Sequence, residues 1–317
     1  MGKKYHYLFG PVPSRRFGRS LGVDLSPPKT CSLDCVFCQL GRTTKKSADR
    51  KEYVPTADVI FELKDWLKTD GQADYITLSG SGEPTLHSRF GEVLAFIREN
   101  SSIPALLLTN GTMLYLPEVR EAASHASIVK ASLCAWDDAS YTKVNRPHPE
   151  LRFDLLVEGE KAFRAEYTGT LFLEVFLIRG MNARPEEVKK IAALAHDINP
   201  DRVQLNTAVR PPAEDYALPL TKDELENLSA LFDPKAEIIA EFRARHGSRF
   251  EANQDAILAM LKRRPCTAEQ IAEVFGMHIN EVSKYLGKLT GNQQVLLERR
   301  NGLIYYTAPS GERRRNA

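Results

Sequence analysis

The sequence has 317 residues, of which 43% are hydrophobic and 26% are charged, and its formal net charge is +2 at pH 7. This composition is that of a globular protein with one large domain and a small one; it excludes disordered and fibrous chains, and the near-neutral charge indicates no acidic partner. Because no run approaches the roughly 18 apolar residues of a membrane span and the N-terminus has no apolar signal segment, we expect a cytoplasmic protein with no membrane partner.

The first two thirds of the chain alternate short apolar runs with amphipathic segments of helical period, a pattern typical of βα units around a parallel sheet. We expect six strands, at residues 21–25, 75–80, 105–110, 128–133, 171–178 and 203–207. Helices are expected at residues 57–68, 89–100, 153–167 and 185–198. Since crossovers between parallel strands are right-handed, residues 1–212 predict an α/β fold that is either a doubly wound sheet or, our preferred interpretation, an open partial (β/α)6 barrel.

The last third of the chain changes character. Residues 213–253 form a predicted helical connector, with helices at 222–232 and 236–245 and a polar boundary at 246–249. Residues 254–309 predict helices at 256–263, 267–275 and 280–289, and then a hairpin whose strands, 295–299 and 303–307, flank the turn sequence Asn301-Gly302. This order is that of a small winged helix-turn-helix domain, and residues 310–317 are a basic tail.

The cysteines indicate a metal site rather than disulfides. Three of the five lie in the run Cys31-Ser-Leu-Asp-Cys35-Val-Phe-Cys38. A C-x3-C-x2-C spacing brings three thiolates from one loop to three corners of an iron-sulfur cube and leaves the fourth iron open to a ligand. The alternative is a structural zinc site, which needs a fourth ligand such as His6 or His148, because no Cys or His lies at zinc-finger spacing from the three cysteines.

With this cysteine spacing, residues 9–212 resemble the radical S-adenosylmethionine (SAM) superfamily. The resemblance implies a [4Fe-4S] cluster on Cys31, Cys35 and Cys38, with SAM bound to the open iron. It also implies an external electron donor: the electron passes through the cluster to the sulfonium of SAM, the C–S bond breaks, and a 5′-deoxyadenosyl radical forms. Phe37 matches the position that borders the adenine in this superfamily.

The segment after the second predicted strand resembles the Gly-Gly-Glu-type motif of the superfamily. It reads Gly80-Ser81-Gly82-Glu83, and Ser81 and Gly82 depart slightly from the pattern. By resemblance, its backbone edge and its carboxylate receive the ammonium group of SAM, and glycine suits a close approach of the backbone to a ligand. The alternative is an ordinary βα turn.

Further SAM contacts are implied at the ends of the later strands. By resemblance, Asn110 and Ser132 face the ribose and the carboxylate of SAM. Ile178 flanks the adenine, and Gln204 and Asn206 reach either SAM or the substrate. Each has a plainer alternative, because Asn-Gly is a common turn and polar or apolar residues at strand ends often serve the fold alone. No side chain stands out as the group that quenches a substrate radical.

Two stretches suggest a narrower kinship. Residues 9–24 and 145–147 resemble the branch that contains the wyosine-forming tRNA enzymes, which use additional cysteines for a second cluster. Cys134 and Cys266 are too few and too scattered for such a site, so only the radical-generating part carries over. The basic residues near the cysteines suit either a phosphate-bearing substrate or a solvated loop. They are Arg15, Arg16, Arg19, Arg42, Lys45 and Lys46.

The C-terminal region carries the basic excess of the chain. From residue 250 onward, ten Lys or Arg stand against seven Asp or Glu. Lys284 and Lys288 lie four apart on the third predicted helix, and Arg299 and Arg300 approach the tip of the hairpin, where they suit contacts with phosphates. The same fold also serves packing or protein contact, so both uses stay open.

Three hypotheses follow. In the first, a radical SAM enzyme modifies RNA, and the winged helix is the nucleic-acid partner site. In the second, a radical SAM enzyme acts on a small molecule or peptide, and the winged helix is a regulatory or dimer contact. In the third, the protein is a non-catalytic iron-sulfur sensor that binds DNA; failure of the reduced protein to cleave SAM favours this one.

Overall fold

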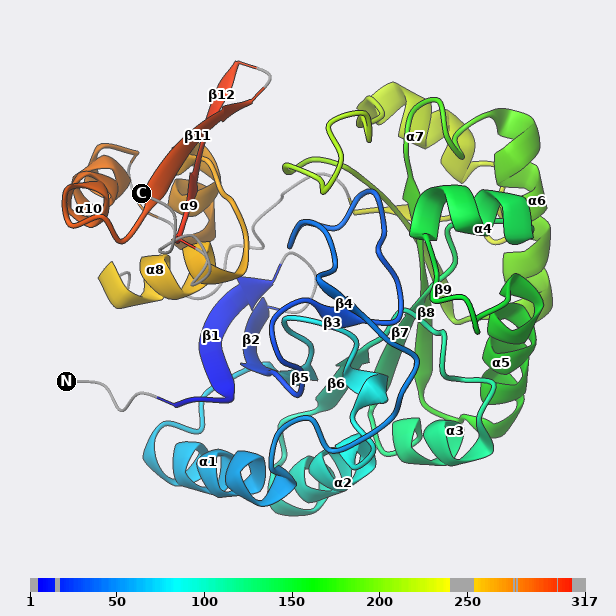
Figure 1. Cartoon of the computed structure of the whole chain (residues 1–317), viewed down its shortest axis with the longest axis horizontal. Helices are drawn as coiled ribbons and strands as arrows, with labels where there is room; N and C mark the ends of the chain where they lie inside the picture. Colours follow the sequence, from blue (N-terminus) through cyan, green and yellow to red (C-terminus); the bar gives the residue numbers. More distant parts are fainter. Residues whose placement is uncertain are drawn as a thin grey trace.

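The computed structural model describes residues 5–14, 18–239, 254–275, 277, 279–300 and 302–309. Within them the fold is α/β, with a mostly parallel central sheet of eight strands (Figure 1). In spatial order these are β1 (Leu8–Ser14), β2 (Gly18–Val23), β5 (Tyr75–Leu78), β6 (Ala105–Leu108), β7 (Ile128–Ser132), β8 (Thr170–Leu177), β9 (Arg202–Thr207) and β10 (Glu237–Ile238). Neighbours from β2 to β10 are parallel, and β1 is antiparallel to β2. All six predicted strands are present.

Two edge strands are absent from the prediction. β1 pairs with β2 at one edge of the sheet, and β10 pairs with β9 at the other. The predicted helix at 236–245 is wrong at residues 237–238, which form β10, and its later part lies outside the described residues together with the boundary at 246–249. Ile238 pairs with Leu205, and such pairing at a sheet edge outweighs the weak helical preference of a short segment.

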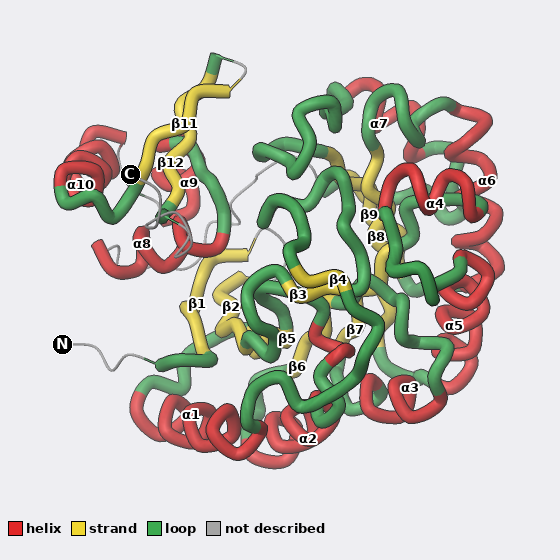
Figure 2. Tube along the Cα trace, in the orientation of Figure 1, coloured by secondary structure: helices red, strands yellow, loops and turns green. Residues whose placement is uncertain are grey.

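Helices surround the sheet of the main domain, and most of them lie along its outer side (Figure 2). They are α1 (Thr56–Thr69), the 3-10 turn η1 (Pro84–Leu86), α2 (Phe90–Asn100), α3 (Pro117–Ala123), α4 (Asp138–Asn145), α5 (Phe153–Glu166), α6 (Pro185–Ile198) and α7 (Lys222–Ser229). The predicted helices before residue 232 are all present, and the prediction lacks α3 and α4. α6 begins with proline at its first turn, where the missing N–H has no cost.

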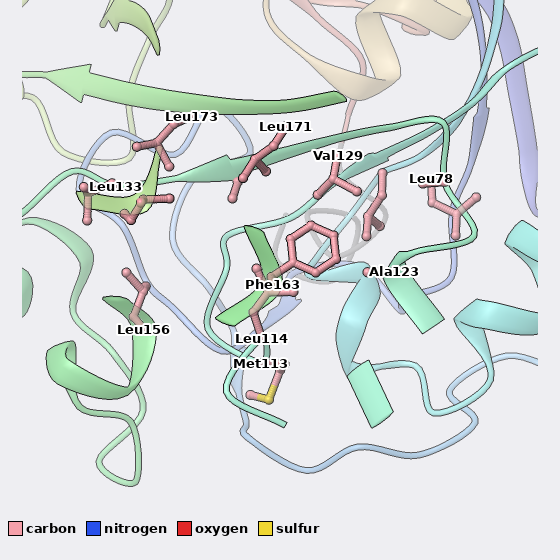
Figure 3. Packing of buried hydrophobic residues seen from close by; sticks show 14 of the residues in the cluster. Leu78, Met113, Leu114, Ala123, Val129, Leu133, Leu156, Phe163, Leu171 and Leu173 are labelled. Atoms are coloured by element: carbon pink, nitrogen blue, oxygen red, sulfur yellow. The ribbon is translucent and has the colours of Figure 1, made fainter. Parts of the chain in front are cut away.

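A buried apolar core lies between the sheet and these helices. Figure 3 shows Val129 of β7 and Leu171 and Leu173 of β8 in the same cluster as Phe163 of α5, and all four are buried. Because successive strand residues point to opposite faces, the residues between them face the inner side of the sheet. That side carries polar side chains, among them Lys130, and it is the side on which a polar ligand finds partners.

The described residues from 254 to 309 form what we call the C-terminal module. It contains α8 (Gln254–Arg263), α9 (Ala268–Phe275), α10 (Ile279–Gly291) and a hairpin of β11 (Leu296–Arg300) and β12 (Leu303–Thr307). These elements lie where helices and strands were predicted, although Asn301 and the tail at 310–317 fall outside the described residues. The module has its own buried apolar cluster, and α8 contacts β1. No helix in the described ranges is long and apolar enough to span a membrane.

A loop between two short strands lies over the inner side of the sheet (Figure 1). The strands are β3 (Thr30–Cys31) and β4 (Lys45–Lys46), which pair in parallel as a separate two-stranded sheet. We call residues 29–47 the cysteine loop. Because β2 runs directly into it, the loop stands at the carboxyl edge of the parallel strands, the edge at which α/β folds bind ligands.

Candidate functional site

The three predicted ligands all lie on the cysteine loop. The two ends of the loop are joined where the Ser47 N–H donates to the Cys31 carbonyl at 3.0 Å. A turn closed by the Cys38 N–H and the Cys35 carbonyl, 3.1 Å apart, brings the last two cysteines together. All three have free thiols of intermediate exposure. One short stretch of chain therefore presents three sulfur ligands.

Burial disfavours the thiolate form of all three cysteines, and repulsion from other cysteine sulfurs adds to this effect at Cys31 and Cys35. Burial, followed by the carboxylate of Glu83, raises the pKa of Cys31 to about 12. Burial, followed by the sulfurs of Cys31 and Cys38, raises the pKa of Cys35 well above its ordinary value, and burial also raises the pKa of Cys38. Metals bind the thiolate and lower thiol pKa values. These three cysteines therefore fit a positively charged iron group, because its charge would offset the burial and the repulsion that disfavour their thiolates.

Two asparagine side chains donate to cysteine sulfurs. Asn110 Nδ2, just after β6, lies 3.5 Å from Cys31 Sγ, and Asn145 Nδ2, at the end of α4, lies 3.3 Å from Cys35 Sγ. Hydrogen bonds to sulfur are among the factors that set the potential of iron-sulfur clusters. Across the described ranges, no group of three or more Cys, His, Asp or Glu side chains, the three cysteines included, surrounds a position for a single metal ion.

The predicted SAM motif after β5 runs against the cysteine loop. The Lys29 N–H donates to the Ser81 carbonyl at 2.7 Å, and the Glu83 N–H donates to the Thr30 carbonyl at 3.2 Å. A Cβ at Gly82 would lie 1.8 Å from that carbonyl oxygen, so glycine is required for the two backbones to approach this closely. The motif and the cysteines therefore lie side by side, although they are some fifty positions apart in the sequence.

Asp24, just after β2, fixes the start of the same motif. Its carboxylate accepts hydrogen bonds from Ser81 Oγ at 2.6 Å and from Ser81 N at 3.1 Å. A Cβ at Gly80 would lie 2.3 Å from Asp24 Cγ, and the φ of Gly80 is +157°. The prediction does not include Asp24. The available signal is an acidic residue that follows directly on the apolar run of a strand.

The carboxylate of Glu83 joins the ends of β5 and β6. It is 3% exposed and accepts hydrogen bonds from Oγ1 of Thr85, Oγ1 of Thr109 and the backbone N–H of Asn110, each at 2.7 Å. Burial raises the pKa of Glu83, whereas these hydrogen bonds lower it. A SAM ammonium group would compete with these internal donors. In the protein itself, Glu83 holds Asn110 beside the cysteine loop.

The two residues predicted to border the adenine lie in one apolar cluster. Phe37 stacks on Phe176 of β8, with ring centroids 4.1 Å apart and ring planes 10° apart. Ile178, directly after β8, is fully buried in the same cluster, together with Val36 of the cysteine loop. The cluster forms an apolar wall beside the cysteines. Phe176 contributes to it without having been predicted, and its signal is an aromatic residue near the end of a strand.

A polar group crosses the inner face of the sheet. Ser132, the last residue of β7, is in register with Glu174 of β8. Asn206 of β9 donates to Glu174 at 3.0 Å, and Lys130 of β7 forms an ion pair with the same carboxylate. Lys130 and Glu174 are 7% and 9% exposed. Because burying an ion pair costs desolvation, such charges within apolar strand runs are a signal of function that the sequence prediction missed.

Gln204 is directed toward the edge of the sheet. Its Nε2 atom donates to Glu237 of β10 at 3.2 Å, and the residue is buried. This bond connects β9 to its neighbour β10, whereas Asn206 of the same strand joins the polar group on β7 and β8. The structure therefore separates two residues for which the sequence implies the same role.

Residues 145–147 hold the cysteine loop from another side. Arg146, whose φ is 46°, donates to the Asp34 carbonyl at 2.5 Å and pairs with Glu214 at 2.6 Å. Arg42 of the cysteine loop pairs with the same carboxylate at 2.7 Å, and these partners lower the pKa of Glu214. Glu214 is absent from the prediction. No local motif marks it, because Arg146 lies 68 positions away.

The basic residues around the cysteines mostly contact the chain itself. Arg15 and Arg16 lie outside the described residues. Arg19 lies 3.9 Å from Asp74, and Lys46 donates to the backbone carbonyls of Arg146 and Pro147 at 3.3 and 3.1 Å. These contacts favour a structural role for Arg19, Arg42 and Lys46 over a phosphate site.

A comparison with protein families identifies this arrangement. The family model described as the Radical SAM superfamily matches residues 25–195, a range that begins before the cysteine loop and ends within α6. The chain belongs to the radical SAM superfamily. It is accordingly a radical SAM enzyme, and the cofactors of this superfamily are SAM and a [4Fe-4S] cluster.

Curated relatives of this radical SAM chain match nearly all of it. It is 30% identical over 308 residues to the "UPF0026 protein MJ1312" of Methanocaldococcus jannaschii, and the match covers 94% of each chain. It is also 35% identical over 303 residues to "GTPase Obg" of Brachyspira hyodysenteriae. That match covers 94% of this chain but 45% of the other protein, so the chain spans less than half the length of that relative.

A solved structure shows the same fold. A radical SAM methyltransferase from Sphaerobacter thermophilus superposes with a TM-score of 0.53 over 71% of this chain and 66% of the other, with 15% sequence identity. At this identity the likeness establishes the arrangement of the elements. It leaves the reaction to be argued from the residues of the radical SAM site.

The C-terminal module contacts the radical SAM domain close to the cysteine loop. Arg300 of β11 lies 3.2 Å from Asp215. Burial raises the pKa of Tyr305 of β12, and the charge of Arg210 lowers it. Arg210 in turn donates to Gln39 of the cysteine loop at 3.1 Å. The segment after β9 therefore connects the hairpin to the loop that carries the cysteines.

Proposed function

We propose that this enzyme holds a [4Fe-4S] cluster on Cys31, Cys35 and Cys38 and cleaves SAM reductively. The observation that carries the proposal is that three thiols of one loop lie beside the ends of β5 and β6, where the predicted SAM motif and Asn110 lie. When bound, the cluster supplies one electron to the sulfonium of SAM. We propose that an external electron donor provides that electron.

We further propose how the chain binds SAM. The apolar wall of Phe37, Phe176 and Ile178 suits the adenine ring. The backbone edge at residues 80–83 suits the ammonium group, since glycine at Gly82 permits a close approach. Asn110 would contact the ribose or carboxylate from beside Cys31. The inner face of the curved sheet, which we interpret as a partial (β/α)6 barrel, would enclose the ligand.

The remaining predicted contacts belong to the inner face. Ser132 stands at the end of β7 beside Glu174, and Asn206 is bonded to that carboxylate. We propose that they orient SAM or the substrate, together with the ion pair of Lys130 and Glu174. Gln204 donates to Glu237, so we propose that it acts on the inner face from the edge of the sheet.

The test of this function is anaerobic reconstitution with iron and sulfide, followed by reduction and addition of SAM. We expect four irons per chain and the release of 5′-deoxyadenosine and methionine in equal amounts. A preparation that binds one zinc ion in tetrahedral sulfur coordination would overturn the proposal. A loaded and reduced cluster that leaves SAM intact would favour the iron-sulfur sensor instead.

We propose that the substrate is RNA and that the C-terminal module binds it as a winged helix-turn-helix. Lys284 and Lys288 are exposed on α10, and Arg299 is exposed on the hairpin, as phosphate contacts require. The resemblance of residues 9–24 and 145–147 to the wyosine-forming branch supports the same substrate class. Crosslinking to cellular RNA and salt-sensitive binding are expected, with a shallower salt dependence after Lys284→Ala and Lys288→Ala.

A specific contact favours the second candidate, in which the substrate is a small molecule or peptide and the module is regulatory. The hairpin touches the segment after β9 through Arg300 and Asp215, and that segment also holds the cysteine loop through Glu214. Comparison of metabolites in cells with and without the gene, together with absence of RNA crosslinks, would select this candidate.

A further inference from the structure

Asn145 is a buried polar residue whose side chain has an unusual set of partners. It is 5% exposed, and its Nδ2 atom lies 3.3 Å from Cys35 Sγ. Its Oδ1 atom is buried and, among the described residues, has no hydrogen-bond partner. An unpaired buried oxygen costs about 1–3 kcal/mol, and leucine, which is branched at the same position, would avoid that cost. The contact with sulfur is what distinguishes the amide from leucine here.

Asn110 offers an informative contrast. Its Nδ2 atom lies 2.8 Å from Ser32 Oγ as well as 3.5 Å from Cys31 Sγ. Its Oδ1 atom accepts hydrogen bonds from the N–H and Oγ1 of Thr112 at 3.0 and 2.7 Å. Hydrogen bonds to Ser32 and Thr112 therefore explain why an amide side chain stands at Asn110. In the part of the chain that the structure describes, no comparable set of bonds explains the amide side chain of Asn145.

The backbone fixes Asn145 against the cysteine loop. The Asp34 N–H donates to the Asn145 carbonyl at 3.1 Å, and the Val36 N–H donates to the Val144 carbonyl at 3.0 Å. These two bonds lie on either side of Cys35. Val36 and Val144 are fully buried in the apolar cluster that also contains Phe37. A hydrogen bond in such surroundings is electrostatically stronger than one in water.

We infer that Asn145 sets the reduction potential of the cluster through its N–H bond to Cys35, an inference that rests on the proposed function. Reduction adds negative charge that spreads onto the ligating sulfurs, and a donor at the sulfur stabilises that charge. The reduced form gains more than the oxidised form, so the bond raises the potential and eases reduction by the external donor. Asn145 is thus a positioning residue that acts through Cys35.

The experiment is a redox titration of the reconstituted full-length enzyme, followed by electron paramagnetic resonance, for the wild type and Asn145→Leu. We expect the variant to bind a full cluster whose ratio of oxidised to reduced forms at fixed potential is about tenfold higher, a shift of about 59 mV to more negative values for one electron. The control is Tyr141→Phe. Tyr141 lies one turn earlier on α4, and its hydroxyl is buried without a partner in the described part of the chain.

An unchanged potential in a fully loaded Asn145→Leu enzyme overturns the inference, and so does an equal shift in Tyr141→Phe, which would indicate general repacking of α4. If the leucine variant fails to take up iron, the wild-type enzyme labelled with 15N-asparagine tests whether Asn145 is bonded to the cluster ligand. Pulsed spectroscopy of its reduced cluster is expected to show a 15N coupling that Asn110→Leu retains, and its absence contradicts the inference. If the wild type forms no cluster at all, it is the proposed function that fails.

Discussion

The cysteine loop and the C-terminal module are attached to the radical SAM domain in different ways. The loop is held by buried polar contacts from several strand ends, including Glu83 to Thr30, Asn110 to Cys31 and Asn145 to Cys35. The hairpin of the module is held by contacts such as Arg300 to Asp215, whose side chain is 91% exposed. Buried contacts tolerate little change, whereas exposed ion pairs contribute little. Changes near the loop should therefore affect chemistry, and changes at the hairpin should affect partners.

The largest effect is expected from removing one ligand. Cys35→Ala leaves two sulfurs, so we expect loss of the cluster and of SAM cleavage to below a thousandth of the wild-type rate, about 4 kcal/mol of activation free energy. The matched control is Cys266→Ala in the module. Cys266 is fully buried there, so this variant should lose stability but keep its iron. Iron analysis and 5′-deoxyadenosine release measure both. Loss of iron in the control would show that the two regions are not independent.

The next effect concerns Glu160 of α5, which is 1% exposed and has no hydrogen-bond partner for either oxygen within the described residues. Burial raises its pKa well above the ordinary 4.5. The folded protein therefore keeps a proton that the unfolded chain releases, and stability falls as pH rises from about 4.5 toward the folded pKa, by up to about 1.4 kcal/mol per pH unit.

Glu160→Gln should remove this loss. We expect the variant to gain stability over the wild type as pH rises, with little difference at pH 4, in chemical unfolding of the apo-protein. Glu158→Gln, at an exposed position of the same helix, is the control and should follow the wild type. Parallel stability curves for Glu160→Gln and wild type would contradict a neutral buried carboxyl group.

Alanine substitutions at two glycines test the difference between the cysteine loop and the C-terminal module. Alanine at Gly82 would place a Cβ 1.8 Å from the Thr30 carbonyl oxygen, so we expect a cost of about 1–3 kcal/mol and weaker SAM binding. Alanine at Gly287 of α10 meets no atom within 4 Å and should stabilise the module by about 0.5–1 kcal/mol. Thermal unfolding and SAM titration measure the pair. A harmless Gly82→Ala would show that the cysteine loop can move away from β5.

The smallest effect is expected at the hairpin. Arg300→Ala removes an exposed ion pair and should cost less than about 1 kcal/mol, a difference that high salt abolishes. Arg299→Ala is the control, because neighbouring strand residues point to opposite faces. Unfolding measured in low and high salt tests the pair, and iron content should stay unchanged in both. A loss of cluster in Arg300→Ala would assign the hairpin a role in holding the cysteine loop.

Much of the fold could be predicted from the sequence because its signals are local. Apolar runs such as that of β8 mark buried strands, and the proline and acids that open α6 mark a helix start. β10 could not be predicted, because two residues have no pattern of their own and become a strand by pairing with β9. The antiparallel β1 is similar, since its partner at the edge of the sheet gives it its role.

The candidate site was partly predictable for the same reason. The cysteine spacing and the Gly-Ser-Gly-Glu segment are motifs within a few residues, and the structure brings them together. Glu174 and Glu214 gave no such motif. Their roles come from partners on other strands and loops, as in the contacts of Glu174 with Lys130 and of Glu214 with Arg42.

The sequence by itself determined the predicted iron-sulfur ligands, because the spacing of Cys31, Cys35 and Cys38 is a local pattern that does not depend on how the rest of the chain folds. The tertiary structure alone decided the surroundings of those ligands. Asn145 reaches Cys35 across 110 positions of sequence, and Asn110 reaches Cys31 across 79. Such contacts form only when the whole sheet and its helices have packed, so no local pattern can encode them.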